Sequence, residues 1–197
     1  LSMRWRSAGR TLVSTLLSGG TMGYTAYISI IYAYGGVANV LYFGYVACLG
    51  LSVAGVALSL ALSSPSTIST ELIEKLPRRS VSLFLLGISG LLILVWGGLA
   101  VASIAAGSAS EANTILVTDL AFVIPAFLLA GHWFWRKRPA GVVLAGTMLV
   151  LNVVLNLSIV SGQLVRFAVG IDPSWGLAGL FATIAFGRGR LLISGPP

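Results

Sequence analysis

The feature that most constrains this chain is a series of long apolar runs without charged side chains. One such run covers residues 81–103 and reads VSLFLLGISGLLILVWGGLAVAS. A helix needs roughly 20 consecutive apolar residues to cross about 30 Å of hydrocarbon, and this run is long enough. Over the whole sequence, 57% of residues are hydrophobic and 9% are charged. Because soluble globular domains carry about 25% charged residues, the composition excludes that class.

Hydropathy predicts an all-α polytopic transmembrane helix bundle with six spans. Their ranges are 12–34, 37–62, 81–103, 115–135, 140–162 and 175–193. These spans and short loops use up the 197 residues, so we expect a single transmembrane domain over 1–197. The last span is the weakest, because Arg188 and Arg190 interrupt its apolar run. Five spans followed by a re-entrant tail is therefore an open alternative.

The distribution of basic residues predicts the orientation. If the N-terminus is cytoplasmic, then of the 12 Lys and Arg residues only Arg166 lies outside. This asymmetry is the one that the positive-inside rule describes. We therefore predict a multi-pass protein of the cell membrane with both termini cytoplasmic. The net charge of +7 is explained by this rule, and we do not expect nucleic acid as a partner.

Several kinds of chemistry lack the residues they need. Cys48 is the one cysteine and His132 the one histidine, so neither a zinc site nor a bis-histidine haem site is expected. A Ser–His–Asp arrangement is not expected either, because Asp119 lies about 20 Å from His132 along the same predicted helix. We predict no catalytic residues, no metal, no cofactor and no enzymatic activity.

The fourth and fifth spans carry polar residues at membrane depth. Asp119 and Pro125 interrupt the fourth span, TDLAFVIPAFLL, while Asn152, Asn156 and Gln163 lie in the fifth. The three amides follow one helix face, at steps of four and seven. Because an unsatisfied polar group in hydrocarbon costs several kcal/mol, this stripe is expected to face protein or water. The short connection RKRPAG makes the two helices antiparallel neighbours, so we hypothesise a contact between Asp119 and Asn156.

Two interpretations of these residues stay open. In one, Asp119, Asn152, Asn156 and Gln163 form a polar pocket, and Pro125 adds a freed backbone carbonyl to it. In the other, the residues are structural: Asp119 caps a helix that starts at 120, or the Asp and Asn side chains join neighbouring helices. The tyrosines, which all lie between 24 and 45, either line a ligand entrance or form an outer aromatic belt that also packs.

Small residues spaced by four indicate close helix packing. The pairs are Gly19 and Gly23, Gly98 and Ala102, and Gly141 and Ala145. Such spacings let helix backbones approach closely, so they support a packed bundle without specifying an oligomer.

The stretch SEANTILVTDLAFVIPAFLLAGHWFWRKRPAGVVLAG resembles a pattern of uncharacterised small polytopic membrane proteins of actinobacterial type. In that pattern, an acidic residue and a proline in one span precede a basic, proline-containing turn. Asp119, Pro125, Arg136, Arg138 and Pro139 match it here. The resemblance implies a topology and carries no activity, and the C-terminal GRGRLLISGPP departs from it.

The sequence therefore favours a non-enzymatic membrane subunit or scaffold, with the lipid bilayer as solvent and a homo-oligomer or another membrane protein as partner. A permease or channel for small solutes or ions, with a pocket between spans four and five, is the alternative. One acid and three amides are few polar groups for coupled transport.

Overall fold

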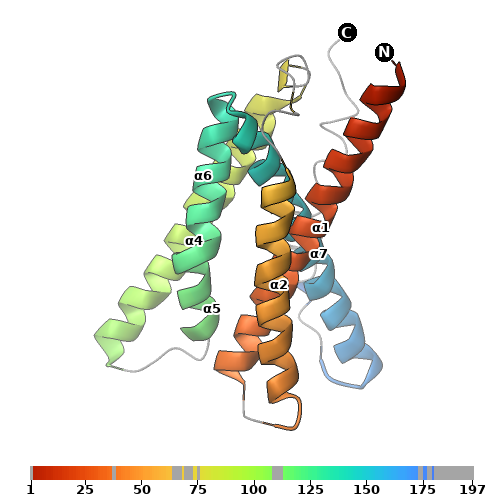
Figure 1. The fold of residues 1–197 in the computed structure, drawn as a ribbon. Coiled ribbons are helices and arrows are strands. Elements are labelled where there is room, and N and C mark those ends of the chain that lie inside the picture. Colours follow the sequence, from red (N-terminus) through yellow and green to blue (C-terminus); the bar gives the residue numbers. More distant parts are fainter. Residues whose placement is uncertain are drawn as a thin grey trace.

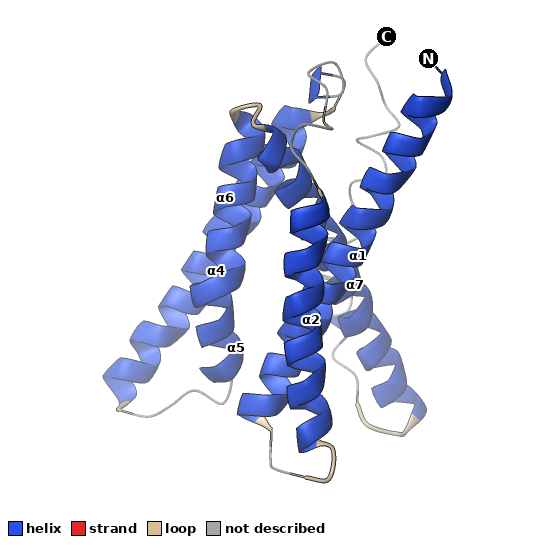
Figure 2. Cartoon of the chain, in the orientation of Figure 1, coloured by secondary structure: helices blue, strands red, loops and turns tan. Residues whose placement is uncertain are grey.

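The computed structural model describes residues 2–36, 39–63, 68, 73–74, 76–107, 113–172, 175–176 and 179, and for residues 2–11 the backbone alone. These described parts are helical and contain no β-strand (Figure 2). The elements are α1 (Ser2–Gly35), α2 (Tyr42–Leu62), α4 (Arg78–Ala106), α5 (Asn113–Thr118), the π-helical η2 (Asp119–Val123), α6 (Ile124–Trp135) and α7 (Pro139–Ala168).

Four of these helices are long and apolar enough to cross a membrane. They are α2, α4, α7 and the continuous helix Asn113–Trp135, which is formed by α5, η2 and α6. The first five predicted spans coincide with helices, although α7 continues to Ala168 where the prediction stopped at 162. The sixth, 175–193, lies outside the described residues except for Trp175, Gly176 and Gly179.

Helix α1 is long enough to cross but is not apolar enough to count among the four. Its sequence explains this, since LLSGGTMGYTAYIS mixes glycine, serine, threonine and tyrosine with the apolar residues. The helix packs against α2, α5 and α7, and Tyr27 and Ser29 are buried. Because neighbouring helices cover it on several sides, α1 can carry polar groups that a lipid-facing helix could not satisfy.

The helices form two groups that contact each other along their length (Figure 1). One group contains α4, α5 and α6, and the other contains α1, α2 and α7. Contacts between α6 and α7 and between α1 and α5 join them. At the upper end of the view, the turn between α6 and α7 lies on the same side as the N-terminus. At the lower end, α4 and α5 lie well apart from α7. Near the α6–α7 turn, α6 and α7 pack directly against each other, whereas at the other end α1 contacts α5.

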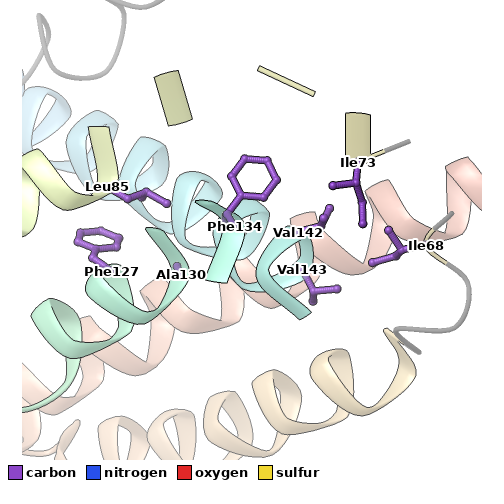
Figure 3. Close-up of a cluster of buried hydrophobic side chains, with 9 residues drawn as sticks. Ile68, Ile73, Leu85, Phe127, Ala130, Phe134, Val142 and Val143 are labelled. Carbon is purple, nitrogen blue, oxygen red and sulfur yellow. The ribbon is translucent and has the colours of Figure 1, made fainter. Parts of the chain in front are cut away.

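The apolar core lies near the α6–α7 turn (Figure 3). Leu85 of α4, Phe127 of α6 and Val143 of α7 are all buried there. Ile68 and Ile73, from the segment before α4, belong to the same cluster. The segment between α2 and α4 therefore contributes apolar side chains to the core.

Glycines set the closest helix approaches. A Cβ on Gly20 would clash with the side chain of Val150 and lie 2.8 Å from the carbonyl oxygen of Thr147, so the backbone of α1 lies directly against α7. Two of the predicted small-residue motifs take part in packing, since Gly23 and Gly141 also have close neighbours. Around Gly98, in contrast, a Cβ would meet nothing within 4 Å.

Candidate functional site around Asp119

Asp119 lies in the middle of a continuous helix, where a π-helical turn begins. The backbone N–H of Ile124 donates to the carbonyl of Asp119, five residues earlier, instead of to the residue four earlier. Pro125 follows directly and has no N–H to donate, so the regular hydrogen-bond ladder is interrupted at this point. A π turn inserts one residue and absorbs the interruption without ending the helix. The interpretation of Asp119 as an N-cap was therefore wrong, because the helix already begins at Asn113.

The side chain of Asp119 points into the bundle and is 6% exposed. Its neighbour on α1 is the buried Tyr27, whose hydroxyl interacts with the carboxylate. The indole of Trp96, from α4, lies beside the same carboxylate. The Trp96 Nε1 does not complete a hydrogen bond there and is buried without a partner. Asp119 thus connects three segments of the chain that are far apart in sequence.

Three further tyrosines show that this region is a packing surface. The hydroxyl of Tyr24 donates to Oγ of Ser158 at 2.5 Å and so joins α1 to α7. Tyr32 of α1 stacks on Tyr45 of α2, with ring centroids 5.2 Å apart. The tyrosines therefore connect α1 to three different neighbours, as the packing interpretation predicts.

The amide stripe of α7 faces protein over its first two members. Asn152 and Asn156 are both buried. The Asn156 side chain donates through Nδ2 to the carbonyl of Asn152 at 2.5 Å, one turn earlier in the same helix. Its Oδ1 is buried without a partner among the described residues. Gln163, nearer the end of α7, is half-buried.

Among the described residues, Asp119 and Asn156 have different interaction partners. Asp119 interacts with Tyr27 and Trp96, while Asn156 bonds to the backbone of its own helix. The hypothesised contact between Asp119 and Asn156 stays a prediction, whereas the interaction that the structure describes for Asp119 is with α1. The physical reason is the central position of α1, which packs against both α5 and α7. Pro125 is exposed and acts on the backbone rather than on the site.

The sequence alone did not identify Tyr27 and Trp96 as neighbours of Asp119. The position of Trp96 could have indicated a role inside the bundle, because it lies in the middle of a span, whereas Trp133 and Trp135 lie at a span end, where tryptophan is common. The position of Tyr27 was a weaker indication, since Tyr24 and Tyr27 share a helix face in a segment of low hydropathy.

Chemically, the arrangement can hold one proton or one charge at Asp119 and supply hydrogen-bond donors around it. Within the described ranges, no group of three or more His, Cys, Asp or Glu side chains is placed to hold a metal ion. His132 lies near the far end of α6, where it is exposed.

Comparisons of the chain with protein-family models, curated proteins and solved structures found no match. The resemblance to actinobacterial-type membrane proteins accordingly stays a prediction.

Proposed function

We propose that this chain is a non-enzymatic subunit or scaffold of the cell membrane, in which Asp119 joins helices rather than transporting a solute. The observation that carries this proposal is the enclosure of the carboxylate by Tyr27 of α1 and Trp96 of α4. A transport site has to open to water on at least one side, whereas an interhelical contact has to be closed. The small residues of α4 support a role in assembly, because Gly97 and Gly98 have open space around them.

The proposal includes the six-span topology with both termini cytoplasmic. Its support is the position of the basic residues, which begin α4 at Arg78 and Arg79 and follow α6 at Arg136, Lys137 and Arg138. In a Cys48→Ala background, Gly35→Cys should react with a membrane-impermeant maleimide on intact cells, and Arg138→Cys only after the cells are opened. If both positions react on intact cells, the topology is wrong.

A double-mutant cycle tests the structural role of Asp119. Tyr27→Phe and Asp119→Asn each remove one partner, and the two changes should be non-additive by about 0.5–2 kcal/mol in the free energy of unfolding in micelles. Tyr24→Phe is the matched control, because its hydroxyl bonds to Ser158 and should add independently to Asp119→Asn. Additivity between Tyr27→Phe and Asp119→Asn would remove the support for the helix contact.

The competing function is tested by flux. The parent protein in liposomes should pass no more protons, Na⁺, K⁺ or Cl⁻ than protein-free liposomes. A flux that the parent protein supports, and that a folded Asp119→Asn variant loses, would overturn the scaffold proposal and establish the carboxylate as a transport residue.

A permease or channel is the second candidate, and one observation favours it. Asn156 Oδ1 is buried without a partner, and such a group can accept a hydrogen bond from a solute. The π turn at Asp119 adds to this, because π turns are frequent at functional sites. Asn156→Leu keeps the side-chain size and removes the amide. The scaffold proposal predicts that this variant folds and that neither it nor the parent protein supports a flux. The permease alternative predicts that the parent protein supports a flux that this variant loses.

A further inference from the structure

A basic depression lies at the turn between α6 and α7, away from Asp119. It has a volume of about 670 Å³ and is lined by Leu83, Leu86, His132, Trp135, Arg136 and Lys137. The two leucines come from α4 and the others from the end of α6 and the following turn. One wall is therefore apolar and the other carries two permanent cations and a histidine.

The cations of this depression are available to a ligand. His132, Arg136 and Lys137 are exposed, and no ion pair joins either cation to a carboxylate within the described residues. Arg79 adds to the charge by its position, because it precedes Leu83 and Leu86 by four and seven residues on the same face of α4. The neighbouring Arg138 differs, since its guanidinium lies over the ring of Trp133 at 5.8 Å.

The backbone of Lys137 provides a second, independent observation. Lys137 has a φ of 58°, and among the described residues other than glycine it alone has a positive φ. Its N–H donates to the carbonyl of Phe134, and the N–H of Arg138 donates to that of Trp133. This pair of bonds is the Schellman motif, whose left-handed position is usually glycine because a Cβ is unfavourable there. A lysine at this position gives up stability that glycine would provide, while it places an ammonium group on the rim of the depression.

We propose that this depression binds the phosphate-bearing headgroup of an anionic phospholipid. The cations of the turn attract the negatively charged phosphate. Trp135 and the exposed Leu83 can contact the glycerol and upper acyl region at the membrane interface. The choice of leaflet depends on the proposed topology, which places this lipid in the cytoplasmic leaflet. The site itself does not depend on that topology.

Lipid titrations of the full chain followed by native mass spectrometry test the proposal. Phosphatidylglycerol should bind the parent protein at least about fivefold more tightly than phosphatidylcholine, the effect of about one cation near the membrane surface. Lys137→Gly and Arg136→Gln should each lose most of this preference. Lys137→Gly should keep or raise the Tm, because glycine relieves the positive φ. That variant separates loss of binding from loss of folding.

Arg138→Gln is the matched control, because it removes the same charge from the same turn but lies over Trp133. Its preference for phosphatidylglycerol should change less than about twofold. An equal loss in Arg138→Gln and Arg136→Gln would mean diffuse attraction by the basic turn and would overturn the site. Equal binding of the two lipids by the parent protein would overturn it as well.

The source of the phosphate is tested with soluble ligands. Inorganic phosphate and glycerol 3-phosphate, present in excess over the lipid, should not displace phosphatidylglycerol. Displacement by either would show that the depression binds a soluble anion and would overturn the lipid assignment.

Discussion

Helices α2 and α4 differ sharply from the Asn113–Trp135 helix and α7 in how much of them other helices cover. All four are long and apolar enough to cross a membrane. In the most apolar 18-residue stretch of each helix, 6% of the residues are buried in α2 and 11% in α4. The buried share is 44% in Asn113–Trp135 and 39% in α7. Hydropathy therefore identifies the solvent of these helices but does not say which sides face protein.

The positions of the polar residues show which side of each helix faces protein. The buried residues of α2 are Ser52 and Ser59, although the helix consists mostly of larger apolar side chains. In α7, Thr147, Asn152 and Asn156 are buried as well. Hydrocarbon offers no hydrogen bonds, so a polar side chain turns toward another helix, and the leucines remain for lipid.

The largest expected effect compares two leucines of α4. Leu85 is 0% exposed and packs in the core, whereas Leu94 is 76% exposed. Leu85→Ala should lower the free energy of unfolding by about 2–5 kcal/mol, because it leaves a cavity between α4 and α6. Leu94→Ala should change it by less than about 0.5 kcal/mol. Unfolding in mixed micelles measures both, and equal losses would mean that α4 has no distinct outer face.

The next effect compares two glycines. Gly20→Ala places a Cβ against Val150 and the Thr147 backbone and should destabilise the protein by about 1–3 kcal/mol. Gly98→Ala has open space and should be neutral or slightly stabilising, because alanine favours the helix by up to about 1 kcal/mol. Thermal unfolding of both variants measures the difference. A tolerated Gly20→Ala would contradict the close approach of α1 and α7.

The smallest effect compares two buried serines of α4. Ser89 donates to the carbonyl of Leu85 at 2.7 Å, whereas Oγ of Ser82 is buried without a partner among the described residues. Ser89→Ala should cost about 0.5 kcal/mol, and Ser82→Ala should be neutral or stabilising by up to about 1 kcal/mol. The same unfolding assay gives the sign for each. A larger loss from Ser82→Ala would indicate a hydrogen bond that the structure does not show.

The sequence predicted the helical class and the approximate ranges of five helices, because runs without charge are local features that hydropathy reads directly. It also predicted that the amides of α7 face protein or water, and Asn152 and Asn156 are buried. It did not predict the partner of Asp119. That partner depends on α1 lying between other helices, and the packing of helices distant in sequence is not encoded in any one span. The π turn before Pro125 was not predicted for a related reason. A proline predicts that the backbone hydrogen-bond ladder of the helix is interrupted, but not how the chain accommodates the interruption.

The native cysteine gives the most direct test of the central claim, that the outer faces of the sparsely covered helices lie in hydrocarbon. Cys48 is exposed on α2 and can carry a nitroxide without any substitution. In phospholipid nanodiscs, the label should collide often with dissolved oxygen and rarely with a water-soluble nickel chelate, because oxygen concentrates in lipid. Frequent collisions with the nickel chelate would place Cys48 in water and contradict the membrane assignment of α2.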